Sequence, residues 1–88
     1  MTNFDYLRAF ILRAKNRKLI LEKLNNGEKT QAQLYNETNM YRTHVRRTLL
    51  ELQEKRLVKC LNPKDRIYKI YVLTEKGKKV IKKLNYLK

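Results

Sequence analysis

The chain has 88 residues, of which 22 are lysine or arginine and 8 are aspartate or glutamate, so its net charge is +14 and its isoelectric point is near 10.2. This excess of cations is far larger than solubility requires; it is expected of a nucleic-acid-binding protein, although a merely basic surface would share it. The single cysteine, Cys60, excludes an intrachain disulfide, and no apolar run is long enough to span a membrane, so we expect one cytoplasmic domain over residues 1–88.

The first third of the chain, residues 3–25, is helical in character. Its apolar residues recur at helical spacing: Leu7, Phe10, Ile11, Ala14, Leu21 and Leu24. The basic segment 13–18 interrupts this face, which predicts either two helices, with Asn16 as the cap of the second, or one bent helix. Asparagine and glycine at 25–27 predict the C-terminal end.

A further helix is predicted to begin at Thr30. Thr30 and Gln33 match the capping box, in which each side chain accepts a hydrogen bond from the backbone amide of the other residue. We expect this helix to end near Glu37 and the segment 38–40 to connect it tightly to the next helix. A helix, a short turn and a second helix with a basic outer face form a helix-turn-helix arrangement.

The most informative segment, residues 41–55, predicts a recognition helix. Val45, Leu49 and Leu52 fall on one face at helical spacing. Six residues on or beside the other faces carry side chains suited to DNA contact: Tyr41, Arg42, Thr43, His44, Arg46 and Arg47. Because the start of a helix already carries a partial positive charge, cations gathered there are unfavourable unless an anion such as phosphate binds.

Residues 57–73 predict a β-hairpin with a cationic tip. The segments 57–61 and 67–73 are rich in β-branched and aromatic residues, and the intervening residues have turn chemistry. Lys64 and Arg66 lie in this turn, where they would contact phosphates or enter a minor groove, or form an ordinary charged turn. Of Tyr68 and Tyr71, on opposite strand faces, we expect one in the core.

The two ends of the chain, an N-terminal extension 1–14 and a helix 75–88 capped by Thr74, supply more apolar surface than three short helices and a hairpin need. These apolar residues are Phe4, Leu7, Phe10, Ile11, Val80, Ile81, Leu84 and Leu87. Because an exposed apolar stripe usually marks an interface, they predict a homodimer. The alternative is that the N-terminal segment folds back on its own domain.

These segments resemble winged helix-turn-helix domains of the MarR/ArsR type, especially the small archaeal regulators. The resemblance covers about residues 15–84 and is carried by the segments 19–24, 30–34, 41–47, 52–58 and 71–77. It implies an α+β fold of three helices with a two-stranded wing. It also implies a protein that represses or activates transcription and is often a homodimer. Two positions depart from the family pattern. Arg56 replaces a usual glycine, which affects the turn into the wing, and Tyr41 replaces a common serine or threonine cap.

Together, the segments predict a sequence-specific, double-stranded DNA-binding regulator, with the recognition helix in the major groove and the wing on the backbone. The expected DNA contacts are Thr30, Gln31, Tyr41, Arg42, Thr43, His44, Arg46, Arg47, Lys64 and Arg66. The alternatives are a nonspecific architectural DNA-binding protein and a winged-helix interaction module in a transcription or RNA assembly. The sequence contains no catalytic set, phosphate-cradling glycine loop or metal-ligand spacing around His44, so we expect no enzyme activity, cofactor or metal.

Overall fold

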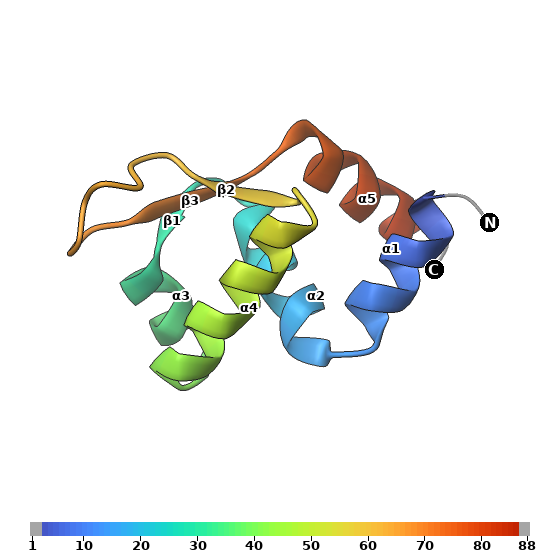
Figure 1. The fold of residues 1–88 in the computed structure, drawn as a ribbon. Helices are drawn as coiled ribbons and strands as arrows, with labels where there is room; N and C mark the ends of the chain where they lie inside the picture. The colour runs from blue at the N-terminus through green and yellow to red at the C-terminus, as the bar shows by residue number, and fades with distance from the viewer. Residues whose placement is uncertain (1–2, 87–88) are drawn as a thin grey trace.

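Five helices and a three-stranded antiparallel sheet make up residues 3–86, which the computed structural model describes (Figure 1). The helices are α1 (Asn3–Leu12), α2 (Lys15–Leu24), α3 (Gln31–Thr38), α4 (Arg42–Glu54) and α5 (Glu75–Tyr86). The strands are β1 (Lys29–Thr30), β2 (Val58–Cys60) and β3 (Ile70–Leu73), in the order β1-β3-β2. The loop between β2 and β3 extends from one end of the body, and α1 and α5 lie together at the other. The predicted α+β winged-helix architecture is confirmed.

The basic segment near residue 15 separates two helices, α1 and α2. Of the two predicted alternatives, two helices are therefore confirmed and one bent helix is not. Asn16 is not the cap, because Ala14 holds the extended cap conformation and no side chain bonds the first amides of α2. Arg17 instead joins the two helices. Its Nη1 donates to the Phe10 carbonyl oxygen (2.6 Å) near the end of α1, and its Nε lies 3.2 Å from Glu51 Oε1 on α4. A cation is favourable at this end of a helix.

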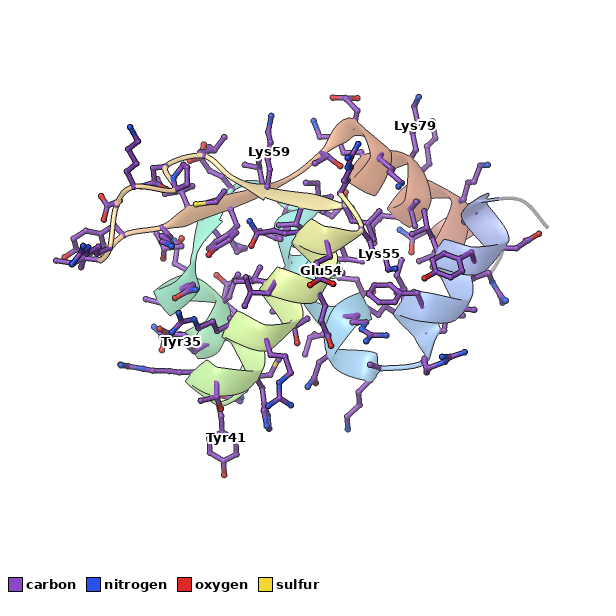
Figure 2. The ribbon with its side chains drawn as sticks, in the orientation of Figure 1. Tyr35, Tyr41, Glu54, Lys55, Lys59 and Lys79 are labelled. Atoms are coloured by element: carbon purple, nitrogen blue, oxygen red, sulfur yellow. The ribbon has the colours of Figure 1, made fainter. Side chains whose placement is uncertain are left out.

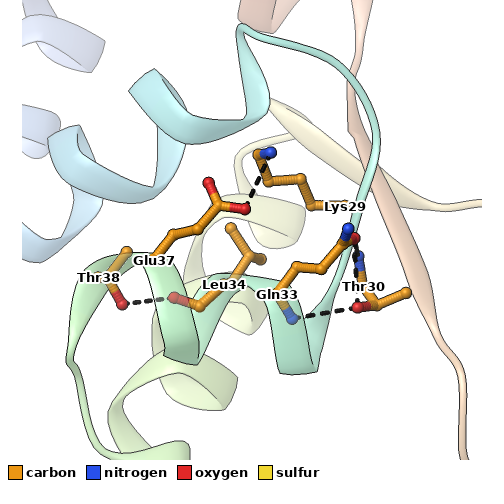
Figure 3. Close-up of polar contacts among 6 residues, drawn as sticks. All are labelled: Lys29, Thr30, Gln33, Leu34, Glu37 and Thr38. Atoms are coloured by element: carbon orange, nitrogen blue, oxygen red, sulfur yellow. Dashed lines mark hydrogen bonds and ion pairs between the residues drawn. The ribbon is translucent and has the colours of Figure 1, made fainter.

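The predicted capping box at the start of α3 is present (Figure 3). Thr30 Oγ1 accepts from the Gln33 amide (3.1 Å), and Gln33 Oε1 accepts from the Thr30 amide (2.8 Å). Asn39 ends the helix in the left-handed conformation, with φ of 57°. These local bonds fix both ends of α3 and therefore the entry into α4.

The sheet differs from the predicted hairpin in two ways. The short strand β1 was not predicted; it pairs with β3, so that Lys29 lies opposite Tyr71. The strand predicted over 67–73 begins only at Ile70, and residues 67–69 belong to the loop. The reason is local, because Asp65 accepts from the amides of Ile67 and Tyr68 and Asn62 donates to the Tyr68 carbonyl oxygen, groups that a strand would have used for its ladder.

The turn into the wing keeps the conformation that a glycine would favour. Arg56 has φ of 60°, in the left-handed region, at some cost for a side chain with a Cβ. Thr74 Oγ1 donates to the Arg56 carbonyl oxygen (2.6 Å) and accepts from the Gly77 amide (3.0 Å). Thr74 therefore caps α5, as predicted, and also holds the strained turn.

The expectation of an exposed apolar stripe at the chain ends is wrong. Leu7 and Ile11 of α1 are 4% and 0% exposed, and Val80, Ile81 and Leu84 of α5 are buried in the same core. Phe4 and Phe10 are partly buried against that core, whereas Leu87 lies outside the described residues. The physical reason is that α1 packs across α5 and α2, which is the fold-back alternative. The homodimer stays a prediction, without the stripe that motivated it.

Candidate nucleic-acid interface

Helix α4 presents one face to the core and the others to solvent. Val45, Thr48, Leu49 and Leu52 are buried, and six side chains near its start are exposed: Tyr41, Arg42, Thr43, His44, Arg46 and Arg47. The predicted division of this helix into a core face and an outer surface is therefore confirmed. Because the helix-turn-helix packing fixes its axis, these outer side chains occupy a defined surface.

The N-terminal end of α4 lacks a side-chain cap and an acidic first turn among the residues that the structure describes. Tyr41 holds the cap position without a side-chain bond to the helix, and no acidic residue lies in the first turn. The Tyr41 ring is 77% exposed, points away from the body (Figure 2), and meets the His44 ring edge-on with centroids 5.6 Å apart. Arg42 lies over the Tyr35 ring of α3 at 5.1 Å. Backbone amides and cations therefore face solvent together here, which suits a phosphate.

A groove of about 290 Å³ lies between α4 and the wing. Its lining residues are Gln31, Arg46, Leu50, Gln53, Cys60, Pro63, Arg66, Lys69 and Tyr71. Three of these are cations, two are amides, and no carboxylate lines the groove within the part of the chain that the structure describes. Such a set can neutralise phosphates and donate hydrogen bonds to base edges.

Tyr71 connects the groove to the core. Its ring is 5% exposed, and Gln31 Nε2 donates to its hydroxyl at 3.4 Å. Burial is the main reason that the pKa of Tyr71 is raised, while Gln31 and Arg46 act in the opposite direction. The phenol therefore stays protonated at neutral pH and remains available as a hydrogen-bond donor. The prediction that one wing tyrosine belongs to the core is confirmed for Tyr71, and Tyr68 is exposed.

Two side chains hold the wing loop in one shape. Asp65 Oδ1 accepts from the amides of Ile67 (2.9 Å) and Tyr68 (2.8 Å), which lowers the pKa of Asp65. Asn62 Nδ2 donates to the Tyr68 carbonyl oxygen (2.6 Å), and Asn62 Oδ1 accepts from the Ile70 amide (2.7 Å). These bonds position Lys64 and Arg66, both exposed, at the tip.

Some of the predicted contact residues meet in space and others do not. Gln31, Arg46 and Arg66 line the same groove, while Thr30 uses its hydroxyl in the capping box. Lys69 and Gln53 also line the groove and were not predicted. Helical spacing could have identified Gln53, seven residues after Arg46, but Lys69 was assigned to a strand. Cys60 is half-buried, packing against the core on one side and lining the groove on the other.

The described residues contain no group of histidine, cysteine, aspartate or glutamate side chains that could hold a metal ion. Among the same residues, no helix has the length and apolar character needed to cross a membrane.

The chain matches the TFIIE alpha subunit family over residues 7–86, and it belongs to this family. The family has a winged-helix fold, so the fold inferred from the MarR/ArsR resemblance agrees with it. No protein of curated function matches the chain.

Several solved winged-helix structures are similar to the chain. A mutant of ZitR from Lactococcus lactis is 26% identical with a TM-score of 0.73; the match covers 83% of this chain and 51% of that one. The transcriptional regulator HlyU from Vibrio vulnificus is 25% identical with a TM-score of 0.71, over 94% of this chain and 90% of that one. The reduced transcriptional regulator YodB from B. subtilis has a TM-score of 0.82 at 21% identity, over 99% and 87%, which shows the fold alone. The chain thus spans about half the length of the ZitR structure. Two of these neighbours, HlyU and YodB, are transcriptional regulators.

Proposed function

We propose that the protein is a sequence-specific regulator of transcription that binds double-stranded DNA. Helix α4 enters the major groove, and the wing between β2 and β3 contacts the backbone beside it. The observation that carries this proposal is the groove in which Arg46 of α4 meets Arg66 and Lys69 of the wing. The similarity to HlyU, itself a transcriptional regulator, supports it.

In this proposal, some side chains contact base edges and others contact phosphates. Arg46 and Arg47 can reach base edges from the middle of α4, where a guanidinium can bond two acceptors of guanine at once. Arg42, Lys64 and Arg66 are exposed and can neutralise phosphates. Gln31 and Gln53 line the groove between them and can bond either a base or a phosphate.

The proposal is tested by selecting bound fragments from random duplex DNA and then measuring competition by unrelated DNA. Sequence-specific binding predicts an enriched motif, and at physiological salt the selected site is bound at least about a thousandfold more tightly than unrelated sequence. Equal affinity for both would instead identify a nonspecific architectural protein. An enriched palindrome would support the predicted homodimer, because two-fold pairing places the recognition helices about 34 Å apart.

A second candidate function is a winged-helix interaction module whose basic face meets an acidic protein within a transcription assembly. Membership of a family named for a subunit favours this candidate. Association with a partner that survives nuclease treatment, and that Arg46→Glu abolishes, would support it over DNA binding.

A further inference from the structure

The tip of the wing carries two large apolar side chains that the protein does not cover. Ile67 is 79% exposed and Tyr68 is 67% exposed, and neither belongs to the core cluster. They are adjacent in the loop that extends away from the body in Figure 1. Single exposed apolar residues are common, but two neighbouring ones at the end of a projecting loop form a local apolar surface.

This apolar tip is held in place before anything binds. Asp65 accepts from the backbone amides of both Ile67 and Tyr68, and Asn62 bonds the Tyr68 carbonyl and the Ile70 amide. The two side chains therefore project from a turn with a fixed backbone. Binding costs less conformational entropy when the contacting segment is already ordered.

Cations flank the two apolar residues in the sequence. Lys64 and Arg66 precede Ile67, Lys69 follows Tyr68, and Arg66 and Lys69 also line the groove against α4. An apolar tip with cations on both sides complements DNA at the level of one base step, where stacked bases lie between two phosphate backbones. An acidic protein surface would satisfy the cations but would leave the two apolar side chains against charged groups.

We propose that Ile67 and Tyr68 form an apolar wedge that enters the minor groove and partly unstacks one base step, so that the bound duplex is kinked. Pyrimidine–purine steps such as TA unstack most easily, so the wedge selects DNA by deformability at a position that α4 does not read. This inference rests on the proposed function, because it requires the wing to lie on duplex DNA.

The experiment uses the full chain and duplexes of about 30 base pairs, long enough to report a kink. Each duplex contains the selected site, end-attached donor and acceptor dyes, and 2-aminopurine in a TA step placed at successive positions outside the α4 contact. Wild-type protein is compared with the Ile67→Ala, Tyr68→Ala double variant. The conservative control is Ile67→Leu, Tyr68→Phe, and the distant control is Tyr6→Ala, at an exposed tyrosine on α1.

We expect wild-type protein to raise 2-aminopurine emission at one position and to shorten the distance between the dyes. The alanine double variant should lose both signals and about tenfold or more in affinity, as loss of base stacking predicts. Its dependence on salt should not change, because the cations remain. The conservative variant and Tyr6→Ala should keep both signals.

Wild-type binding without unstacking or shortening would overturn the wedge alone, as would an alanine double variant that unstacks the step like the wild type. The latter result would indicate that Ile67 and Tyr68 contact a protein partner and not DNA. Failure of the wild type to bind any duplex would overturn the proposed function together with the wedge.

Discussion

The α4–wing end and α5 are both rich in cations but differ in how those cations are arranged. Helix α5 has five exposed lysines, namely Lys76, Lys78, Lys79, Lys82 and Lys83. They follow from its amphipathic pattern, because Val80, Ile81 and Leu84 are buried on the opposite side. At the α4–wing end, cations from two elements instead converge on one groove with amide side chains.

Acidic residues make the contrast clearer. The groove beside α5, of about 800 Å³, is lined by Lys78 and Lys82 but also by Glu28 and Glu75. Lys78 lies 3.5 Å from Glu75, so part of its charge is already balanced. Charge density alone therefore does not single out one end of the molecule. The interface proposed above lies where cations converge without a carboxylate among the described lining residues.

The largest expected effect is on stability, at the α1–α5 end. Ile11→Ala should lower the free energy of unfolding by about 2–5 kcal/mol, because the side chain is fully buried in α1. Leu12→Ala, at an exposed neighbour, should change it by less than about 0.5 kcal/mol. Urea denaturation measures both. Equal effects would mean that α1 does not belong to the core.

The next effect concerns base reading. Arg46→Ala and Arg47→Ala should each weaken binding to the selected site, and at least one should relax base preference by about 1–3 kcal/mol if it bonds guanine at two points. Lys79→Ala on α5 is the matched control and should leave affinity nearly unchanged. Equal losses on selected and unrelated DNA would make both arginines phosphate contacts.

A smaller effect, on how DNA affinity depends on salt, distinguishes the contribution of the wing from that of α5. The double variant Lys64→Ala, Arg66→Ala should weaken binding to all duplexes alike and reduce the slope of log affinity against log salt by about 0.9 for each phosphate that the wing no longer neutralises. The double variant Lys79→Ala, Lys82→Ala carries the same change in charge and should keep the slope. If the wing variant keeps the wild-type slope, the wing is not in the interface.

Substitutions of Thr30 test whether this predicted DNA contact stabilises the fold instead of binding DNA. Because its hydroxyl caps α3, Thr30→Ala should lower the free energy of unfolding by about 1 kcal/mol, and Thr30→Ser should restore it. Denaturation and DNA titration of the same variants separate the two roles. A loss of affinity at unchanged stability would assign Thr30 to the DNA.

The smallest effect is on the pH dependence of the wing. The pKa of Asp65 is lowered in the folded chain, so its two amide bonds contribute above the ordinary carboxyl pKa of about 3.9 and are lost as pH falls through the lower folded value. Amide hydrogen exchange at Ile67 and Tyr68 should become less protected over that acid range. Asp65→Asn should remove the pH dependence, and a wing that responds to acid equally in that variant would contradict the assignment.

The sequence predicted the parts of the fold that local chemistry determines. Thr30 and Gln33 form the capping box, Thr74 caps α5, and Val45, Leu49 and Leu52 form the core face of α4, all from residue type and spacing. Each of these features depends on residues within a few positions of one another. Helical spacing and capping are local rules, so they can be read without tertiary contacts.

The parts that the sequence did not predict depend on distant contacts. Strand β1 has only two residues and exists because it pairs with β3 about forty positions later, as loop-closing contacts cannot be read from a local pattern. Burial of Leu7 and Ile11 likewise depends on where α5 lies, and so the stripe was expected to be exposed. In the site, Lys69 lines the groove as a loop residue, because β3 begins only at Ile70 and not at residue 67 as predicted.

The most direct test of the proposed interface is to map the bound surface by titrating duplex DNA into the protein and following backbone amide chemical shifts. We expect the largest changes from Tyr41 to Arg47 and in the wing from Asn62 to Lys69, with little change along α5. Changes concentrated on the lysines of α5, with α4 and the wing unaffected, would contradict the proposed interface.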